Sequence, residues 1–178
     1  TFDNIGLFNS LSGNVRNLAM SDYTVMGSNY TGGLASTLDG GTVTNVLLNG
    51  SVWGNNQSGG MIGVMNSGVI SNALVNGFVN SGAYTSDAGG MVGLMNAGSI
   101  SGSGTNVAVT AVENVGGLVG RAVGGTISNT FATGMILNQD PNGGKVGGLI
   151  GQVVNATVDS SWSSGIVQNS SFFTGGLV

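Results

Sequence analysis

The sequence lacks cysteine and histidine altogether, and among its 178 residues it has only three basic side chains, Arg16, Arg121 and Lys145. Without cysteine there is no disulfide, zinc-thiolate site or thiol nucleophile. Without histidine the commonest general base and metal ligand is missing. Three scattered cations cannot form a surface that neutralises phosphates, so we expect neither nucleic acid nor an anionic membrane surface as a partner.

Charge and proline are also scarce. Charged residues make up 6% of the chain, where about 25% is usual, and the single proline excludes collagen and polyproline structures. The hydrophobic share of 40% is too high for a disordered linker. The stretch from Gly40 to Ser86 is uncharged, but glycine, asparagine and serine interrupt it every few residues. We therefore expect a packed chain without membrane insertion.

Glycine is the abundant residue, with 35 copies, and it recurs at regular intervals. A Gly-Gly doublet followed by two apolar residues repeats along the chain, and a degenerate copy without the doublet stands at its start. With the second glycine as origin, successive copies are 27, 27, 30, 27, 31 and 28 residues apart. The origins are Gly6, Gly33, Gly60, Gly90, Gly117, Gly148 and, for a partial seventh copy, Gly176.

Other positions keep the same register. Asparagine stands twelve residues past the origin in the second, third and fifth copies, and Gly102 takes this place in the fourth. Each copy thus has three apolar clusters separated by glycine, asparagine and serine, which is typical of short strands. Ten residues past the origin lie the β-branched residues Val43, Ile70, Ile100, Ile127 and Val158.

A repeat of 27–31 residues with three short strands cannot bury a core alone, but it can when it stacks on its neighbours. We therefore predict an all-β protein, a parallel β-solenoid (β-helix) of about six coils, as one domain over residues 1–178. Six coils would form a rod of roughly 29 Å. An antiparallel sandwich or a propeller is the alternative, although propeller blades need about 40 residues or more. The handedness stays open.

One ladder of large apolar residues follows the origin glycine directly. The residue after each of them is mostly apolar too, whereas neighbours in a regular strand point to opposite faces. Two interpretations follow: a bend brings both residues into the core, which we favour, or one ladder forms an exposed stripe for lateral association. The ladder consists of Leu34, Met61, Met91, Leu118, Leu149 and Leu177.

The segment from Gly117 to Ile136 carries a family resemblance. It reads Gly-Leu-Val-Gly-Arg, then Gly-Gly-Thr-Ile-Ser-Asn, then glycine and an apolar residue, and it resembles the GLUG repeat, whose core is Gly-Leu-aliphatic-Gly. Weaker copies extend the resemblance over essentially the whole chain. The resemblance implies a repeat region of a large bacterial surface or secreted protein, such as an adhesin. The resemblance implies no enzymatic activity for the repeat, since catalysis in GLUG-containing peptidases resides in a separate domain.

The chemistry of an enzyme or a metal site is poorly represented. β-Helix enzymes that cleave polysaccharides use clustered carboxylates, but the seven acids here do not share one offset from the origin and form no ladder, so we expect no catalytic residue and no cofactor. Asp140 lies in an inserted Asn/Pro/Gly-rich loop and is a weak calcium candidate, because one carboxylate is too little charge for tight binding. The acids are Asp3, Asp22, Asp39, Asp87, Glu113, Asp140 and Asp159.

Aromatic residues are few. Trp53 and Trp162 stand at different offsets, twenty and fourteen residues past the origin, so the sequence does not indicate an aromatic strip for sugar binding. Phe131 and Trp162 share their offset with Leu47 and Leu74, which we interpret as core packing.

The repeat starts near Thr1 and stops at Val178, so we expect either a window of a longer array or a subunit that stacks end to end. The residues at such assembly ends would be Phe2, Leu7, Phe172 and Leu177. The expected function is structural: a secreted or cell-surface stalk, fibre or adhesin, with copies of itself or flanking repeats as partners. The alternative is a module that binds a glycan or host surface through a solenoid face or the inserted loops around Tyr84 and Asp140, and a polysaccharide-active enzyme comes third.

Overall fold

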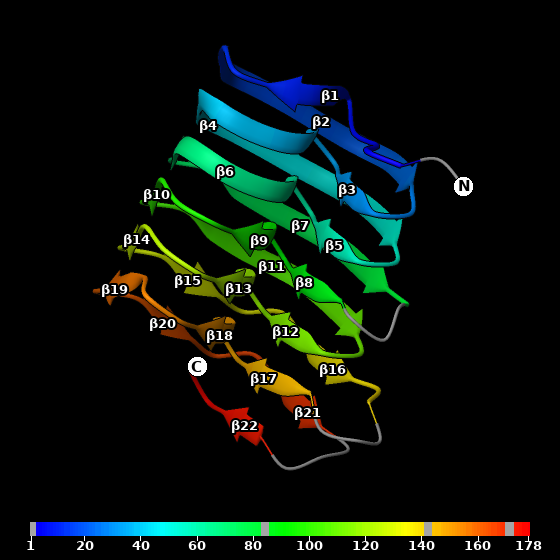
Figure 1. Cartoon of the computed structure of the whole chain (residues 1–178), viewed down its shortest axis with the longest axis vertical. Helices are drawn as coiled ribbons and strands as arrows, with labels where there is room; N and C mark the ends of the chain where they lie inside the picture. Colours follow the sequence, from blue (N-terminus) through cyan, green and yellow to red (C-terminus); the bar gives the residue numbers. More distant parts are fainter. Residues whose placement is uncertain (1–2, 83–85, 141–143, 170–172) are drawn as a thin grey trace.

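The computed structural model describes residues 3–82, 86–140, 144–169 and 173–178, and this part of the chain is built from strands without a helix. The strands form a stack of coils, with the first coil at the top of Figure 1 and the last at the bottom. Hence no described segment is a helix of the length and hydropathy that crossing a membrane requires. Two sheets, of sixteen and six strands, share the coils between them.

The strands are listed here by their place in the coil. The six-stranded sheet consists of β3 (Tyr30–Gly32), β5 (Gln57–Gly59), β8 (Asp87–Gly89), β12 (Asn114–Gly116), β17 (Lys145–Gly147) and β22 (Phe173–Gly175). After the origin glycines follow β1 (Phe8–Leu11), β4 (Ala35–Gly54), β6 (Ile62–Ser71), β9 (Val92–Met95), β13 (Val119–Ala122) and β18 (Ile150–Val153). The next strands are β10 (Ser99–Ser101), β14 (Thr126–Ser128) and β19 (Thr157–Asp159). The rear of the coils is formed by β2 (Asn14–Met26), β7 (Leu74–Ser81), β11 (Gly104–Ala111), β15 (Phe131–Ala132), β16 (Ile136–Asn138), β20 (Trp162–Ser163) and β21 (Val167–Asn169).

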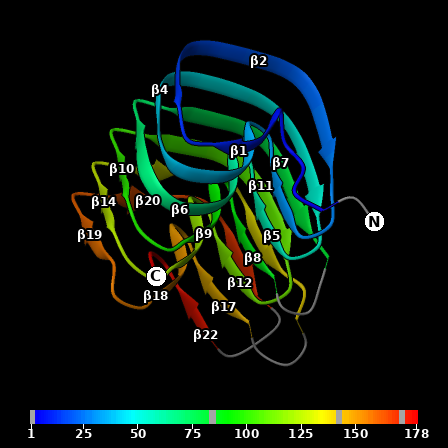
Figure 2. The same cartoon turned by 45° about the horizontal axis from the view of Figure 1, so that its top comes forward.

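Every strand pairs in parallel with its equivalent in the next coil, as Figure 2 shows from above. The β-branched residues ten positions past the origin are Cα partners from one coil to the next, in the order Val43, Ile70, Ile100, Ile127 and Val158. Residues at equal offsets in the repeat are therefore paired in the sheet. The predicted parallel β-solenoid of about six turns is therefore confirmed. Pairing resumes after residues 83–85 and 141–143, where the longer copies have their extra residues.

The corner after each glycine doublet explains how two successive residues enter the core. The amides of Leu34 and Ala35 both donate to the carbonyl of Met61, at 2.9 and 3.1 Å, and those of Leu118 and Val119 both donate to that of Leu149. Because consecutive amides point the same way, the chain turns instead of alternating. Leu34, Met61, Met91, Leu118 and Leu149 are 0% exposed, as are the residues that follow them. The alternative of an exposed stripe along this ladder is therefore wrong.

The doublet is glycine because neighbouring backbone lies too close for a side chain. A Cβ on Gly89 would collide with the carbonyl oxygen of Val92, and one on Gly90 would collide with that of Gly117 in the next coil. The same two clashes recur at the other doublets of the interior coils. Neither glycine of a doublet has a positive φ, so close approach, and not left-handed backbone, explains the repeat.

Left-handed backbone occurs instead twelve residues past the origin. Asn45, Asn72 and Asn129 have φ between 50° and 54°, and Gly102 has φ 54° in the fourth coil. Asparagine and glycine tolerate this conformation better than other residues. The apparent departure of the fourth copy from the asparagine pattern therefore satisfies the same backbone requirement.

The division of a coil differs from the three short strands that we predicted. Each strand of the six-stranded sheet ends at the first glycine of a doublet, and this sheet has no counterpart among the three predicted clusters. Its strands are three residues long, and their buried middle residue is Thr31 or Ser58 in the early coils, in place of the Ala88 and Val115 of later coils. So short and so weakly apolar a strand has no visible periodicity in the sequence.

Candidate functional site

The expected assembly ends carry the exposed members of the core ladders. Leu7 is 56% exposed and Leu177 is 39% exposed, whereas their equivalents in the coils between are fully buried. Phe2 and Phe172 lie outside the described residues. The first and last coils thus expose apolar side chains at positions that are buried between neighbouring coils in the interior.

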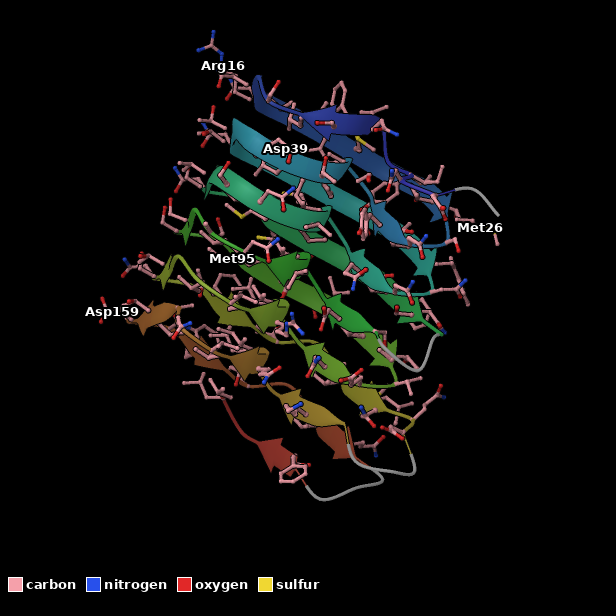
Figure 3. All side chains as sticks on the ribbon, viewed as in Figure 1. Arg16, Met26, Asp39, Met95 and Asp159 are labelled. Atoms are coloured by element: carbon pink, nitrogen blue, oxygen red, sulfur yellow. The ribbon has the colours of Figure 1, made fainter. Side chains whose placement is uncertain are left out.

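The acidic residues are distributed along the stack, and Asp39 and Asp159 lie far apart. Figure 3 places Asp39 on the front of the stack and Asp159 at its left edge, several coils apart. Within the described residues, no group of three acids forms that could hold a metal ion. Asp140, the weak calcium candidate, is partly buried, and its backbone amide donates to Asn138 Oδ1 at 2.8 Å, while the rest of its inserted loop, residues 141–143, lies outside the described residues.

Asp39 belongs to a polar row along the outside of the coils. Its carboxylate accepts hydrogen bonds from Ser10, Thr37 and Asn66, each at 2.7 Å, and Asn96 donates in turn to Asn66 at 2.9 Å. The bonds from Asn66, Thr37 and Ser10 lower the pKa of Asp39. This row ties four successive coils together, so its carboxylate has a structural role.

Asp87 is the most buried carboxylate, at 4% exposure, and it too serves the stack. Asn114 in the next coil donates to Asp87 Oδ1 at 2.7 Å, and Gln57 in the preceding coil approaches Oδ2 at 3.5 Å. The three residues are Cα partners in the six-stranded sheet. Both carboxylates thus accept hydrogen bonds along the axis of the stack.

The aromatic residues differ most from expectation. Phe131 and Trp162, which we expected in the core, point outward from the rear strands, and Trp162 is 52% exposed. Their rings stack, with centroids 5.3 Å apart and planes at 15°. Phe131 also lies over Gly104 of the preceding coil, where a Cβ would collide with its ring. The column continues through Leu74 to Leu47, which is 43% exposed.

The prediction that Phe131 and Trp162 lie in the core was wrong because the inward-facing residues of this strand segment are small and the outward-facing ones are large. The inward positions of the segment flank the column, and in the fourth and fifth coils they hold small or hydroxyl residues such as Ser103, Thr105 and Thr130. These buried hydroxyls are satisfied locally: Ser103 donates to the carbonyl of Ser101 at 2.8 Å and Thr105 to that of Gly117 at 2.7 Å. The larger side chains are left outside, against the usual order of burial.

A second aromatic pair joins the second and third coils. Trp53 on β4 and Phe78 on β7 have ring centroids 5.2 Å apart, with planes at 53°. Trp53 has Asn80 as its Cα partner and Phe78 has Ser51, so the two rings meet diagonally. Two residues of different offset therefore become neighbours, which comparison at equal offsets could not detect.

These side chains share the outer side of the rear sheet, and we call them the aromatic face. Six of them are among the exposed large hydrophobic residues of the chain, a concentration that is unusual on a solvent-facing sheet. The aromatic face consists of Met26, Leu47, Trp53, Leu74, Phe78, Phe131, Met135, Trp162 and Ile166.

The coil geometry defines a class of protein, a repeat protein with a parallel β-solenoid fold. A comparison with protein families agrees with this class: the model of the GLUG motif matches residues 111–137. The matched segment is one coil long and includes the doublet Gly116-Gly117, the buried Leu118 and the left-handed Asn129. The chain therefore contains a GLUG repeat. No curated protein and no solved structure matched the chain.

Proposed function

We propose that this chain is a structural repeat module of an extracellular bacterial fibre, stalk or adhesin. The observation that carries the proposal is the continuity of the ladders. From β1 to β22, each coil hydrogen-bonds to the next in register, and the same positions stack as buried aliphatic columns. Such a stack resists bending and offers proteases few loops, which is what a spacer outside a cell requires.

The proposed partners are copies of the chain or flanking repeats of a longer chain. The exposed Leu7 and Leu177 support this proposal, because another coil stacked on either end would bury them as Leu34 and Leu149 are buried. The location outside a bacterial cell is supported by the GLUG repeat and by the absence of cysteine.

We propose further that the module has no catalytic activity of its own. The carboxylates of Asp39 and Asp87 are engaged in axial hydrogen bonds in separate rows, which supports this proposal. Incubation with plant and microbial polysaccharides, followed by measurement of reducing ends, should show no release above buffer. Release that disappears in the D39N or D87N variant would contradict the proposal.

Electron microscopy across a protein concentration series tests end-to-end association. We expect rods that lengthen with concentration and, in aligned samples, a reflection near 4.8 Å along the rod axis. An L7D/L177D double variant should form only short rods, because buried carboxylates at the junction are costly. Wild-type rods that never lengthen would exclude self-stacking and leave flanking repeats as the axial partners.

A further inference from the structure

The aromatic face combines apolar rings with unpaired amides. On this face, two residues after the column that includes Leu47 and Leu74, runs a column of Asn49, Asn76 and Asn106, which are successive Cα partners. Asn49 and Asn106 are exposed, and their amides make no hydrogen bond to another described side chain. Each amide offers two donors and an acceptor. A partner of this face must therefore present apolar surface and hydrogen-bonding groups at the same time.

The Trp53–Phe78 pair is the part of the face with the most relief. On one side lies a depression of about 380 Å³ lined by Met26, Trp53, Asn55 and Asn80, among others. On the other side lies one of about 390 Å³, to which Phe78, Asn49 and Ser51 contribute. The ring pair is thus a ridge between two shallow, amide-lined hollows.

Charge is nearly absent from this region. Arg121 and Lys145 lie on β13 and β17, outside the rear sheet, and Figure 3 shows Arg16 at the opposite edge of the molecule from Met26. Asp22 is the one charged residue that lines either hollow. The surface therefore complements a neutral partner and has no cation to bind an anionic one.

We propose that the aromatic face binds a neutral polysaccharide, with the Trp53–Phe78 ridge as its centre. Pyranose rings have apolar C–H faces that pack on aromatic rings, and their hydroxyls both donate to and accept from amides. A second copy of this chain is the competing occupant, since asparagine amides on two facing copies can pair with each other, and the dimerisation measurement below distinguishes it. The proposal adds a ligand to the structural module and does not depend on its function as a stalk or fibre.

The test is affinity electrophoresis of the whole chain in native gels that contain soluble neutral polysaccharides: mixed-linkage β-glucan, xyloglucan or galactomannan. We expect retardation by at least one of them, and a dissociation constant about tenfold weaker for W53A. W53F keeps a ring at this position and should retain most of the affinity. Y30A is the matched control: Tyr30 is exposed to 39%, close to the 42% of Trp53, but it lies on the six-stranded sheet, so this variant should bind as wild type.

Fluorescence provides a readout that does not rely on a destabilising variant. In W162F, Trp53 is the only tryptophan, and its emission should shift to the blue when the retarding polysaccharide is added. Equal retardation of W53A and wild type, retardation only by anionic polygalacturonate, or no retardation by any neutral polysaccharide would overturn the proposal. So would concentration-dependent dimerisation that W53A abolishes, since a second copy would then be the partner.

Discussion

Single glycines decide whether the coils can approach one another. Gly90 lies against the carbonyl of Gly117, and any side chain there would collide with the backbone of the next coil. Backbone in a hydrogen-bonded ladder cannot yield without weakening the pairing on both sides. The doublet is thus a steric requirement of coil stacking.

The first prediction concerns this contact. Gly90→Ala should lower the free energy of unfolding by about 2 kcal/mol, because the new methyl group overpacks the corner. Chemical denaturation monitored by circular dichroism measures the change. Gly13→Ala is the control, since a Cβ at Gly13 meets nothing within 4 Å and its φ is not in the left-handed region. Equal stability of the two variants would contradict the steric explanation.

The second prediction concerns the left-handed position. Asn72 has φ 50°, and its equivalent in the next coil is Gly102 with φ 54°. Asn72→Ala should cost roughly 1 kcal/mol through backbone strain, whereas Asn72→Gly should change stability by less. Thermal unfolding of the two variants side by side checks the order. If alanine and glycine lowered the stability equally, loss of the asparagine side chain rather than backbone strain would explain the effect.

At the scale of the element, apolar residues of the same type face the core in some segments and the solvent in others. At the corner after the doublet, large aliphatic residues such as Leu118 are fully buried. In β4, β7 and β15 the column that includes Leu47 points outward although it is equally apolar. Residue type alone therefore does not distinguish core from surface in this chain.

The third prediction compares these two leucines. Leu118→Ala should destabilise the protein by about 3 kcal/mol, because it opens a cavity in a fully buried column. Leu47→Ala, at 43% exposure, should cost less than about 0.5 kcal/mol. Urea denaturation gives both values with the same probe. Similar losses for the two variants would mean that Leu47 is covered in solution, for example by a second copy.

At the scale of the whole molecule, the described strands pair with their equivalents in the neighbouring coils. The hydrogen bonds between coils run along the axis, so a force applied to the two ends separates one coil at a time. The stability of the rod is then approximately the sum of similar coil–coil contacts.

The fourth prediction follows from this arrangement. In a single-molecule pulling experiment with the chain between two marker domains, we expect repeated releases of about 95 Å, the extended length of one 28-residue coil less its axial rise. Gly90→Ala should lower the force of some releases and leave the others unchanged. Release of the whole chain in one step would contradict independent coils.

The sequence by itself determined the coil. The recurrence of the doublet and of the β-branched position predicted parallel stacking in register, and the pairing of Val43 with Ile70 and Ile70 with Ile100 follows it residue by residue. This was possible because a solenoid repeats its contacts at the period of its sequence, so equal offsets are neighbours in space.

Only the tertiary structure decided which way side chains face at the corner and on the rear sheet. The turn at Leu34 and Ala35 depends on two amides sharing the carbonyl of Met61, and nothing in the local pattern shows this. The Trp53–Phe78 pair brings together residues at different offsets in neighbouring coils. The column that includes Leu47 can face outward because the buried hydroxyls beside it, such as that of Thr105, make hydrogen bonds within the core. These features depend on contacts between coils and on local hydrogen bonds, and the position of a residue within its repeat does not reveal either of them.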